Sequence, residues 1–121
     1  MGVNHALETC HRQRLQADGD GTGADGVVFR ERIEAEWLPA LERFAPQLIL
    51  ISAGFDGHVE DDIADLRLRE QDYAWITAQL KNIATRHAGG RIVSVLEGGN
   101  TLSALGRSVV AHLKVFLGAT V

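Results

Sequence analysis

The stretch that decides the fold is residues 47–56, which read QLILISAGFD. Residues 47–52 form a short apolar run directly after Pro46, and such a run predicts a strand that is covered on both faces. Strands of this kind belong to parallel sheets, because the helices that join parallel strands lie on the faces of the sheet. Asp56 follows the run, so the sequence places a carboxylate just past a buried strand.

Helical and strand patterns alternate on both sides of this run. Apolar side chains recur at three- and four-residue steps in residues 27–44, 70–87 and 102–116, and each pattern predicts an amphipathic helix. Residues 91–96 form a second apolar strand. The order α-β-α-β-α predicts an α/β fold: part of a doubly wound parallel sheet, with two core strands joined by a right-handed crossover and flanked by helices.

Composition places the chain among small soluble proteins. It has 121 residues, with 12 basic and 16 acidic side chains, a net charge of −4 and a single cysteine. The absence of basic blocks argues against nucleic-acid binding. No apolar run approaches the roughly 18 residues that cross a bilayer, so no membrane contact is expected. Residues 1–13 are polar and lack the core of a secretory signal, which favours a cytoplasmic location.

A parallel sheet of two strands is too small to stand alone, because its edges and faces need cover. Residues 1–26 are polar and rich in glycine, so they are poor candidates for additional strands. We therefore expect a second copy or another chain to complete the sheet. Self-association, as a dimer or a larger homo-oligomer, is the favoured interpretation.

Two loops follow the predicted strands at the edge where open α/β sheets bind ligands. The first loop gathers acidic residues and a histidine, a set that suits a divalent cation: Asp56, His58, Glu60, Asp61, Asp62 and Asp65. In the alternative interpretation, Asp56 caps the following turn and the other acids are solvated. The second loop carries Glu97, two glycines and Asn100 at a helix N-terminus, where backbone N–H groups can face an anion, although a glycine pair alone is more often a tight turn.

Four motifs, in this order and spacing, carry a resemblance to a known family. They are LPAL at residues 38–41, FAPQLILISAGFD at 44–56, DYAW at 72–75 and VLEGG at 95–99. They resemble the C-terminal part of the histone deacetylase family, which includes bacterial acetylpolyamine amidohydrolases. The resemblance covers residues 15–121 as one α/β portion and leaves residues 1–14 as an N-terminal extension.

The resemblance implies zinc-dependent hydrolysis of an acetylated amine on a larger sheet. In that chemistry zinc polarises the acetyl carbonyl and activates a water, a histidine pair handles the proton, and a tyrosine stabilises the oxyanion. Asp56 falls at the family's second aspartate zinc ligand. Asn100 stands where the family has its catalytic tyrosine; its amide can donate a hydrogen bond, but it is shorter than tyrosine.

The family's other zinc ligands come from an upstream aspartate-x-histidine motif, and its general base from a histidine pair that is not found in this sequence. Asp56-Gly57-His58 spells the ligand motif but aligns with a later loop, which leaves His58 a weak metal candidate. We therefore expect a truncated deacetylase-like chain without deacetylase activity of its own, acting as an oligomeric binding or interaction module that does not hold zinc tightly.

Two alternatives remain open. The chain could be an amidohydrolase for acetyl-lysine or acetylpolyamines whose zinc site is completed by oligomerisation. It could instead be the C-terminal piece of a split enzyme whose missing part is a separate chain. Two other motifs are set aside: residues 18–23 begin like a calcium loop but lack its final glutamate, and residues 21–26 spell a dinucleotide fingerprint without a preceding strand.

Overall fold

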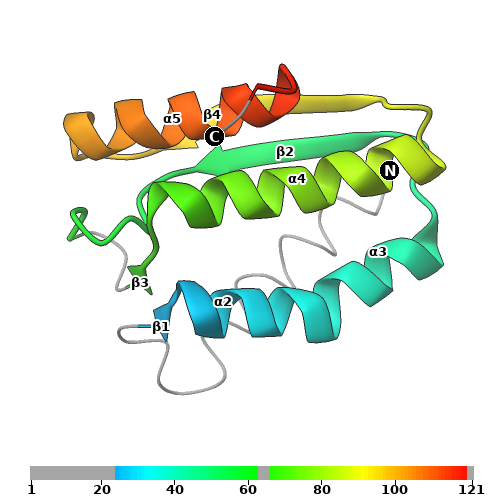
Figure 1. Cartoon of the computed structure of the whole chain (residues 1–121), viewed down its shortest axis with the longest axis horizontal. Helices are drawn as coiled ribbons and strands as arrows, with labels where there is room; N and C mark the ends of the chain where they lie inside the picture. Colours follow the sequence, from blue (N-terminus) through cyan, green and yellow to red (C-terminus); the bar gives the residue numbers. More distant parts are fainter. Residues whose placement is uncertain (1–23, 63–65, 120–121) are drawn as a thin grey trace.

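The computed structural model describes residues 24–62 and 66–119 and contains a parallel sheet with helices packed beside it (Figure 1). The sheet consists of β2 (Ile49–Gly54) and β4 (Ile92–Gly98), paired in parallel with Ile49 opposite Ile92. The crossover helix α4 (Glu70–His87) joins the two strands. The predicted α/β fold with two parallel core strands is therefore confirmed.

Helix α4 and the last helix, α5 (Leu102–Phe116), have the bounds that the apolar periodicity predicts. The chain leaves α4 through Gly89 and Gly90, whose φ angles of 57° and 79° are in the left-handed region. Glycine adopts this region without a steric penalty, so the pair lets the chain turn at once into β4.

The first predicted helix is continuous but contains a wider turn. It consists of α2 (Gly26–Arg32), the π-helical segment η1 (Ile33–Trp37) and α3 (Leu38–Phe44). In the wide turn the backbone N–H of Leu38 donates to Ile33 O, five residues back. Pro39 follows directly and has no N–H to donate, so the regular bonding pattern is interrupted at this point.

Two clusters of buried side chains form the core. One is made by Leu41, Ile49, Ile83, Ala84 and Ala88, where α3, β2 and α4 meet, and the other by Ala53, Phe55, Leu68 and Tyr73 below the end of β2. Burying each large apolar side chain contributes about 1.5–3 kcal/mol, so these two clusters are the main source of stability among the described residues.

One face of the sheet remains open, which differs from the expectation of a strand covered on both faces. Leu50 is 52% exposed, Val93 48% and Val95 56%. Along a strand, alternate side chains point to opposite faces, so these three lie on the face away from the buried Ile49 and Ala53. The apolar run is unbroken although the described helices cover only one face.

A second pair of strands was not predicted. β1 (Ala24–Asp25) and β3 (Leu66–Arg67) pair in parallel over two residues each, which is too short for any periodicity to show. Asp25 also caps α2 by accepting hydrogen bonds from the N–H groups of Val27 and Val28. Residues 1–14, the calcium-like motif at residues 18–23 and the first three residues of the dinucleotide-like motif at 21–26 lie outside the described residues.

No helix in the described ranges is long and apolar enough to cross a membrane.

Candidate functional site

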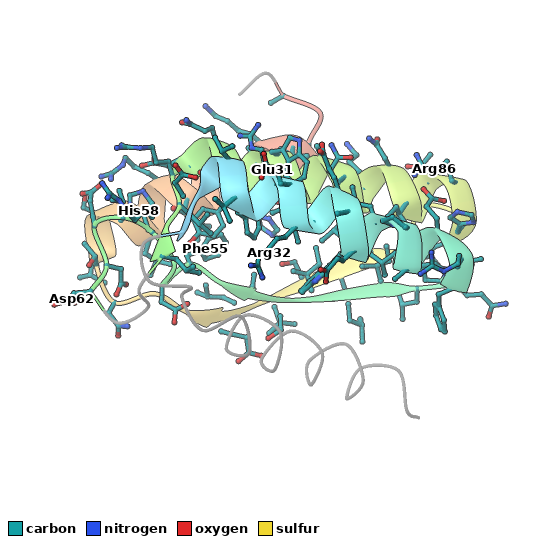
Figure 2. The ribbon with its side chains drawn as sticks, turned by 90° about the horizontal axis from the view of Figure 1, so that it is seen from below. Glu31, Arg32, Phe55, His58, Asp62 and Arg86 are labelled. Atoms are coloured by element: carbon teal, nitrogen blue, oxygen red, sulfur yellow. The ribbon has the colours of Figure 1, made fainter. Side chains whose placement is uncertain are left out.

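Asp56 lies where the carboxyl ends of β2 and β4 meet. The N–H of Phe55 donates to Gly98 O at 2.9 Å, which ties the two strand ends together. Built Cβ atoms on Gly54 and Gly98 would lie 3.1 and 3.6 Å from Asp56 Oδ1, so the two glycines leave room for the carboxylate above both strands. Figure 2 shows Phe55, His58 and Asp62 at this end of the molecule and Arg86 at the other.

Tyr73 forms the floor beneath the loop that follows Asp56. Its ring packs edge-on against Phe55, with 5.0 Å between the ring centroids, and only 7% of the residue is exposed. Burial raises the pKa of the Tyr73 phenol, and the nearby Asp56, Asp61 and Asp72 raise it further. The phenol therefore stays protonated, and Tyr73 acts as a core residue rather than as an acid or base.

His58 is 1% exposed and is held by its own loop. Its Nδ1 accepts a hydrogen bond from the backbone N–H of Glu60 at 3.1 Å, and its Nε2 lies 3.3 Å from Glu70 Oε1. A neutral imidazole carries one proton, so Nδ1 as acceptor places that proton on Nε2. In this arrangement neither ring nitrogen has a free lone pair for a metal.

His58, Glu60 and Glu70 nevertheless form a group that could hold a metal, with one ligand atom from each within 4.8 Å of the others. Arg107 already binds both carboxylates. Its Nε donates to Glu70 Oε1 at 2.5 Å, and its guanidinium forms an ion pair with Glu60. The hydrogen bond from Arg107 is the largest of the effects that lower the pKa of Glu70 to about 2. A metal ion would have to displace this guanidinium and reorient the histidine.

Asp61 connects the two loops of the site. It is 5% exposed, and its Oδ2 accepts from the N–H groups of Asn100 at 2.8 Å and Thr101 at 3.2 Å. Thr101 makes no side-chain cap bond of its own, so Asp61 provides the N-terminal cap of α5 from the other loop. A carboxylate at this end also interacts favourably with the helix dipole.

The structure therefore brings the three predicted site residues to one end of the sheet. Asp56 is half-buried at the strand ends, His58 is buried beneath its loop, and Asn100 is exposed, with its backbone held by Asp61. Among the other acidic residues predicted in the first loop, Asp62 is exposed and Asp61 is buried and hydrogen-bonded. Asp65 lies outside the described residues. The metal roles of Asp56 and His58 and the catalytic role of Asn100 stay predictions.

Three comparisons with known proteins place the chain in a family. The model of the histone deacetylase domain matches residues 15–116. The chain belongs to the histone deacetylase family. It is 44% identical over 94 residues to the type-2 histone deacetylase 2 of Dictyostelium discoideum, and 50% identical over 79 residues to a histone deacetylase-like amidohydrolase of Pseudomonas aeruginosa. The solved structure of the HDA15 HD domain matches it with a TM-score of 0.73 and 30% identity.

These alignments cover most of this chain and a small part of each histone deacetylase relative. They include 75%, 65% and 81% of this chain, in the order given, and 6%, 20% and 27% of the three relatives. The α/β fold and the family are thus established for this chain. The chain spans at most about a quarter of the length of these three relatives.

Sequence reasoning missed the cluster of Glu60, Glu70 and Arg107 and the role of Asp61. Arg107 lies 37 residues from Glu70 and 47 from Glu60, so no local spacing indicates that they meet. For Asp61, the available signal was an acid in one loop and a helix start without a side-chain cap in the other.

Proposed function

We propose that this chain does not hydrolyse acetylated amines by itself and acts as a homo-oligomeric binding module with a histone deacetylase fold. The observation that carries the proposal is the donor set at the strand ends. Zinc sites use three or four protein ligands, and catalytic sites use three plus a water. Among the described residues, Asp56 is the one side chain at a position matching a zinc ligand of the family.

The neighbours of Asp56 support this proposal. His58 is turned so that its proton lies on Nε2, and Asn100 replaces the tyrosine that would donate to the oxyanion. Bound zinc would supply polarisation of an acetyl carbonyl and activation of water. A single carboxylate is a poor holder of such an ion, so we expect little zinc to remain on the purified protein.

The open face of the sheet supports the oligomeric part of the proposal. Leu50, Val93 and Val95 are each about half exposed and lie together on that face. Contiguous apolar surface of a few hundred Å² marks an interaction site in a soluble protein. A binding module that associates through such a surface removes it from water.

Metal analysis and an acetate assay test the catalytic part. The purified full chain is expected to contain well below one zinc per protomer and to release no acetate from an acetyl-lysine peptide or an acetylpolyamine. Stoichiometric zinc with acetate release, both lost in Asp56→Ala and both retained in Asp62→Ala, would overturn the proposal. Asp62 is the matched control because it is an exposed carboxylate in the same loop.

A second candidate function is a zinc amidohydrolase whose site is completed by another chain. The space that Gly54 and Gly98 leave for Asp56 favours it, because the one matching ligand sits at the strand ends with room above it. Co-purification with a polypeptide that carries an aspartate-x-histidine segment, together with acetate release by the complex, would support this candidate. Loss of that activity in Asp56→Ala would show that the Asp56 carboxylate belongs to the site that the two polypeptides form together.

A further inference from the structure

The outer edge of β4 is free among the described residues. Ile49 N–H donates to Arg91 O at 3.1 Å, and Ile51 and Ser52 lie opposite Ser94 and Val95. In a parallel pair alternate residues of a strand bond to the same neighbour. The backbone groups of Arg91, Val93 and Val95 therefore face β2, and those of Ile92 and Ser94 point to the free edge.

This edge lacks the features that keep exposed strands apart. Edge strands are commonly protected by charged side chains, proline or bulges that twist the edge away. The centre of β4, residues 92–96, reads IVSVL and contains neither a charge nor a proline. The irregularity in its pairing with β2 falls at the end of the strand, next to Ala53 and Gly54.

The sequence of β4 is complementary to itself in the antiparallel direction. Pairing about a twofold axis at Ser94 sets Val93 against the partner's Val95 and Arg91 against the partner's Glu97. Val93 and Val95 lie on the open face, because alternate residues of β4 share a face up to the irregularity. Arg91 directly precedes β4, and Glu97 is the extra residue of the irregularity, since Ala53 and Gly54 lie opposite Leu96 and Gly98. Ser94 is then opposite the partner's Ser94, and both have backbone groups that point outward, as a hydrogen-bonded pair requires.

Helix α5 has an apolar surface beside the same edge. Leu102 is 80% exposed, Val110 51%, Leu113 49% and Leu117 82%, and we call these four residues the α5 stripe. The opposite side of α5, with Ala104, Ser108 and Ala111, is buried. Figure 1 shows α5 beside β4, at the side of the molecule opposite α2 and α3. The stripe thus lies on the side of α5 opposite its buried residues, and α5 itself lies beside β4 (Figure 1).

We propose that a second copy of this chain pairs with β4 along its free edge, antiparallel about Ser94, to give a four-stranded sheet with the two α5 stripes in contact. The inference rests on the self-association in the proposed function and specifies its surface. A twofold contact needs one patch that is complementary to itself, and β4 with Arg91 and Glu97 at its two ends provides it.

The combined surface also suits a stable dimer better than the sheet face alone. Stable interfaces bury about 800 Å² on each partner. In the four-stranded sheet Val93 and the partner's Val95 lie side by side, and the rest of the open face, including Leu50, stays in water. The strand edge and the α5 stripe add apolar surface that lies next to them.

Charge reversal tests the pairing in the full chain. Arg91→Glu and Glu97→Arg each create two pairs of like charges in the dimer, one at each end of the contact. Because a cross-strand charge pair contributes up to about 1 kcal/mol, each variant is expected to weaken the dimer about tenfold. The double variant restores opposite charges and should recover the affinity. Arg43→Glu, at an exposed position on α3, is the control and should leave the dimer unchanged. Sedimentation or light scattering over a dilution series gives the dissociation constants.

Amide hydrogen exchange provides the second measurement. In the dimer the Ser94 amide should be protected and should lose that protection on dilution, whereas the Val93 and Val95 amides, which face β2, stay protected throughout. Leu113→Glu should weaken the dimer more than Lys114→Glu, which places a carboxylate at the neighbouring exposed position outside the α5 stripe and changes the net charge by one unit more.

The outcomes separate this inference from the proposed function. A dimer that persists in all charge variants, with a freely exchanging Ser94 amide, would keep self-association and overturn the β4 contact. A monomer at every concentration would overturn both. A monomer with a protected Ser94 amide would show that another segment of this chain occupies the edge, which also overturns the pairing of two copies.

Discussion

At the scale of single residues, His112 shows how a polar ring is accommodated in the core. It is 6% exposed, and both of its ring nitrogens contact hydroxyl groups: Nδ1 lies 2.7 Å from Thr77 Oγ1 and Nε2 lies 2.9 Å from Ser94 Oγ. The Thr77 hydroxyl donates to Tyr73 O, so its oxygen accepts from Nδ1–H and Nε2 accepts from Ser94. The neutral ring is thus fully bonded.

Burial lowers the pKa of His112 below its ordinary value of 6.5. Below that pH the unfolded state therefore binds more protons, so the contribution of His112 to stability is complete above 6.5 and is lost as the pH falls from 6.5 through the lower pKa of the folded state. We expect the urea midpoint to decrease from about pH 7.5 to about pH 5.5. His112→Gln keeps hydrogen-bonding groups without titrating and should flatten this profile; an unchanged slope would contradict the assignment. Glu42 and Glu70, whose pKa values are lowered from 4.5, titrate below this window.

The pKa of Glu70 tests the cluster at the site. Because the hydrogen bond from Arg107 is the main cause of the low value of about 2, Arg107→Gln should raise the pKa of Glu70 toward 4.5. A carbon NMR titration of the glutamate carboxyl groups measures it directly. Arg86→Gln serves as control, since Arg86 pairs with Glu42 instead. A Glu70 pKa that does not move in Arg107→Gln would mean that the guanidinium lies elsewhere in solution.

At the scale of elements, the sequence predicted the helices and strands that a local apolar pattern can indicate. The bounds of α4 and α5 follow from long apolar periodicity, and the parallel pairing of β2 and β4 from the helix between them. The wide turn in the first helix was not predicted, because apolar periodicity does not take account of Pro39, which lacks the N–H that a regular helix would use. The short β1 and β3 pair depends on contacts between distant segments, so no local pattern could reveal it.

The packing of α2 on the start of α4 depends on Gly26. A Cβ on Gly26 would lie 2.2 Å from Asp72 Oδ1, and Asp72 accepts from Arg69 N–H at 2.9 Å and pairs with Arg30. Gly26→Ala should therefore displace this buried carboxylate and cost about 1–3 kcal/mol of unfolding free energy. Gly106→Ala, in the middle of α5 with open space around its Cβ, is the control and should stabilise the helix by up to about 1 kcal/mol. Urea unfolding at one protein concentration compares them; equal effects would contradict the close contact.

At the scale of the whole molecule, the site could be predicted only in outline. Asp56 and Asn100 were placed because parallel strands end at one edge, and that geometry follows from the strand order. The state of His58 could not be predicted, since it is set by the Glu60 N–H and by Glu70 from another element. The unbroken apolar run of β2 predicted cover on both faces, and the described helices provide it on one.

Assembly should therefore show in the stability of the protein. If a second copy pairs with the edge of β4, folding and association are coupled, and the unfolding midpoint depends on protein concentration. Raising the concentration from about 1 to about 100 µM should add roughly 2.7 kcal/mol per dimer, by mass action. Arg91→Glu, which weakens the pairing, should lower the midpoint at both concentrations. A midpoint that is the same at both concentrations would mean that the single chain is stable alone, with its described helices on one face of the two-stranded sheet and the edge of β4 unpaired.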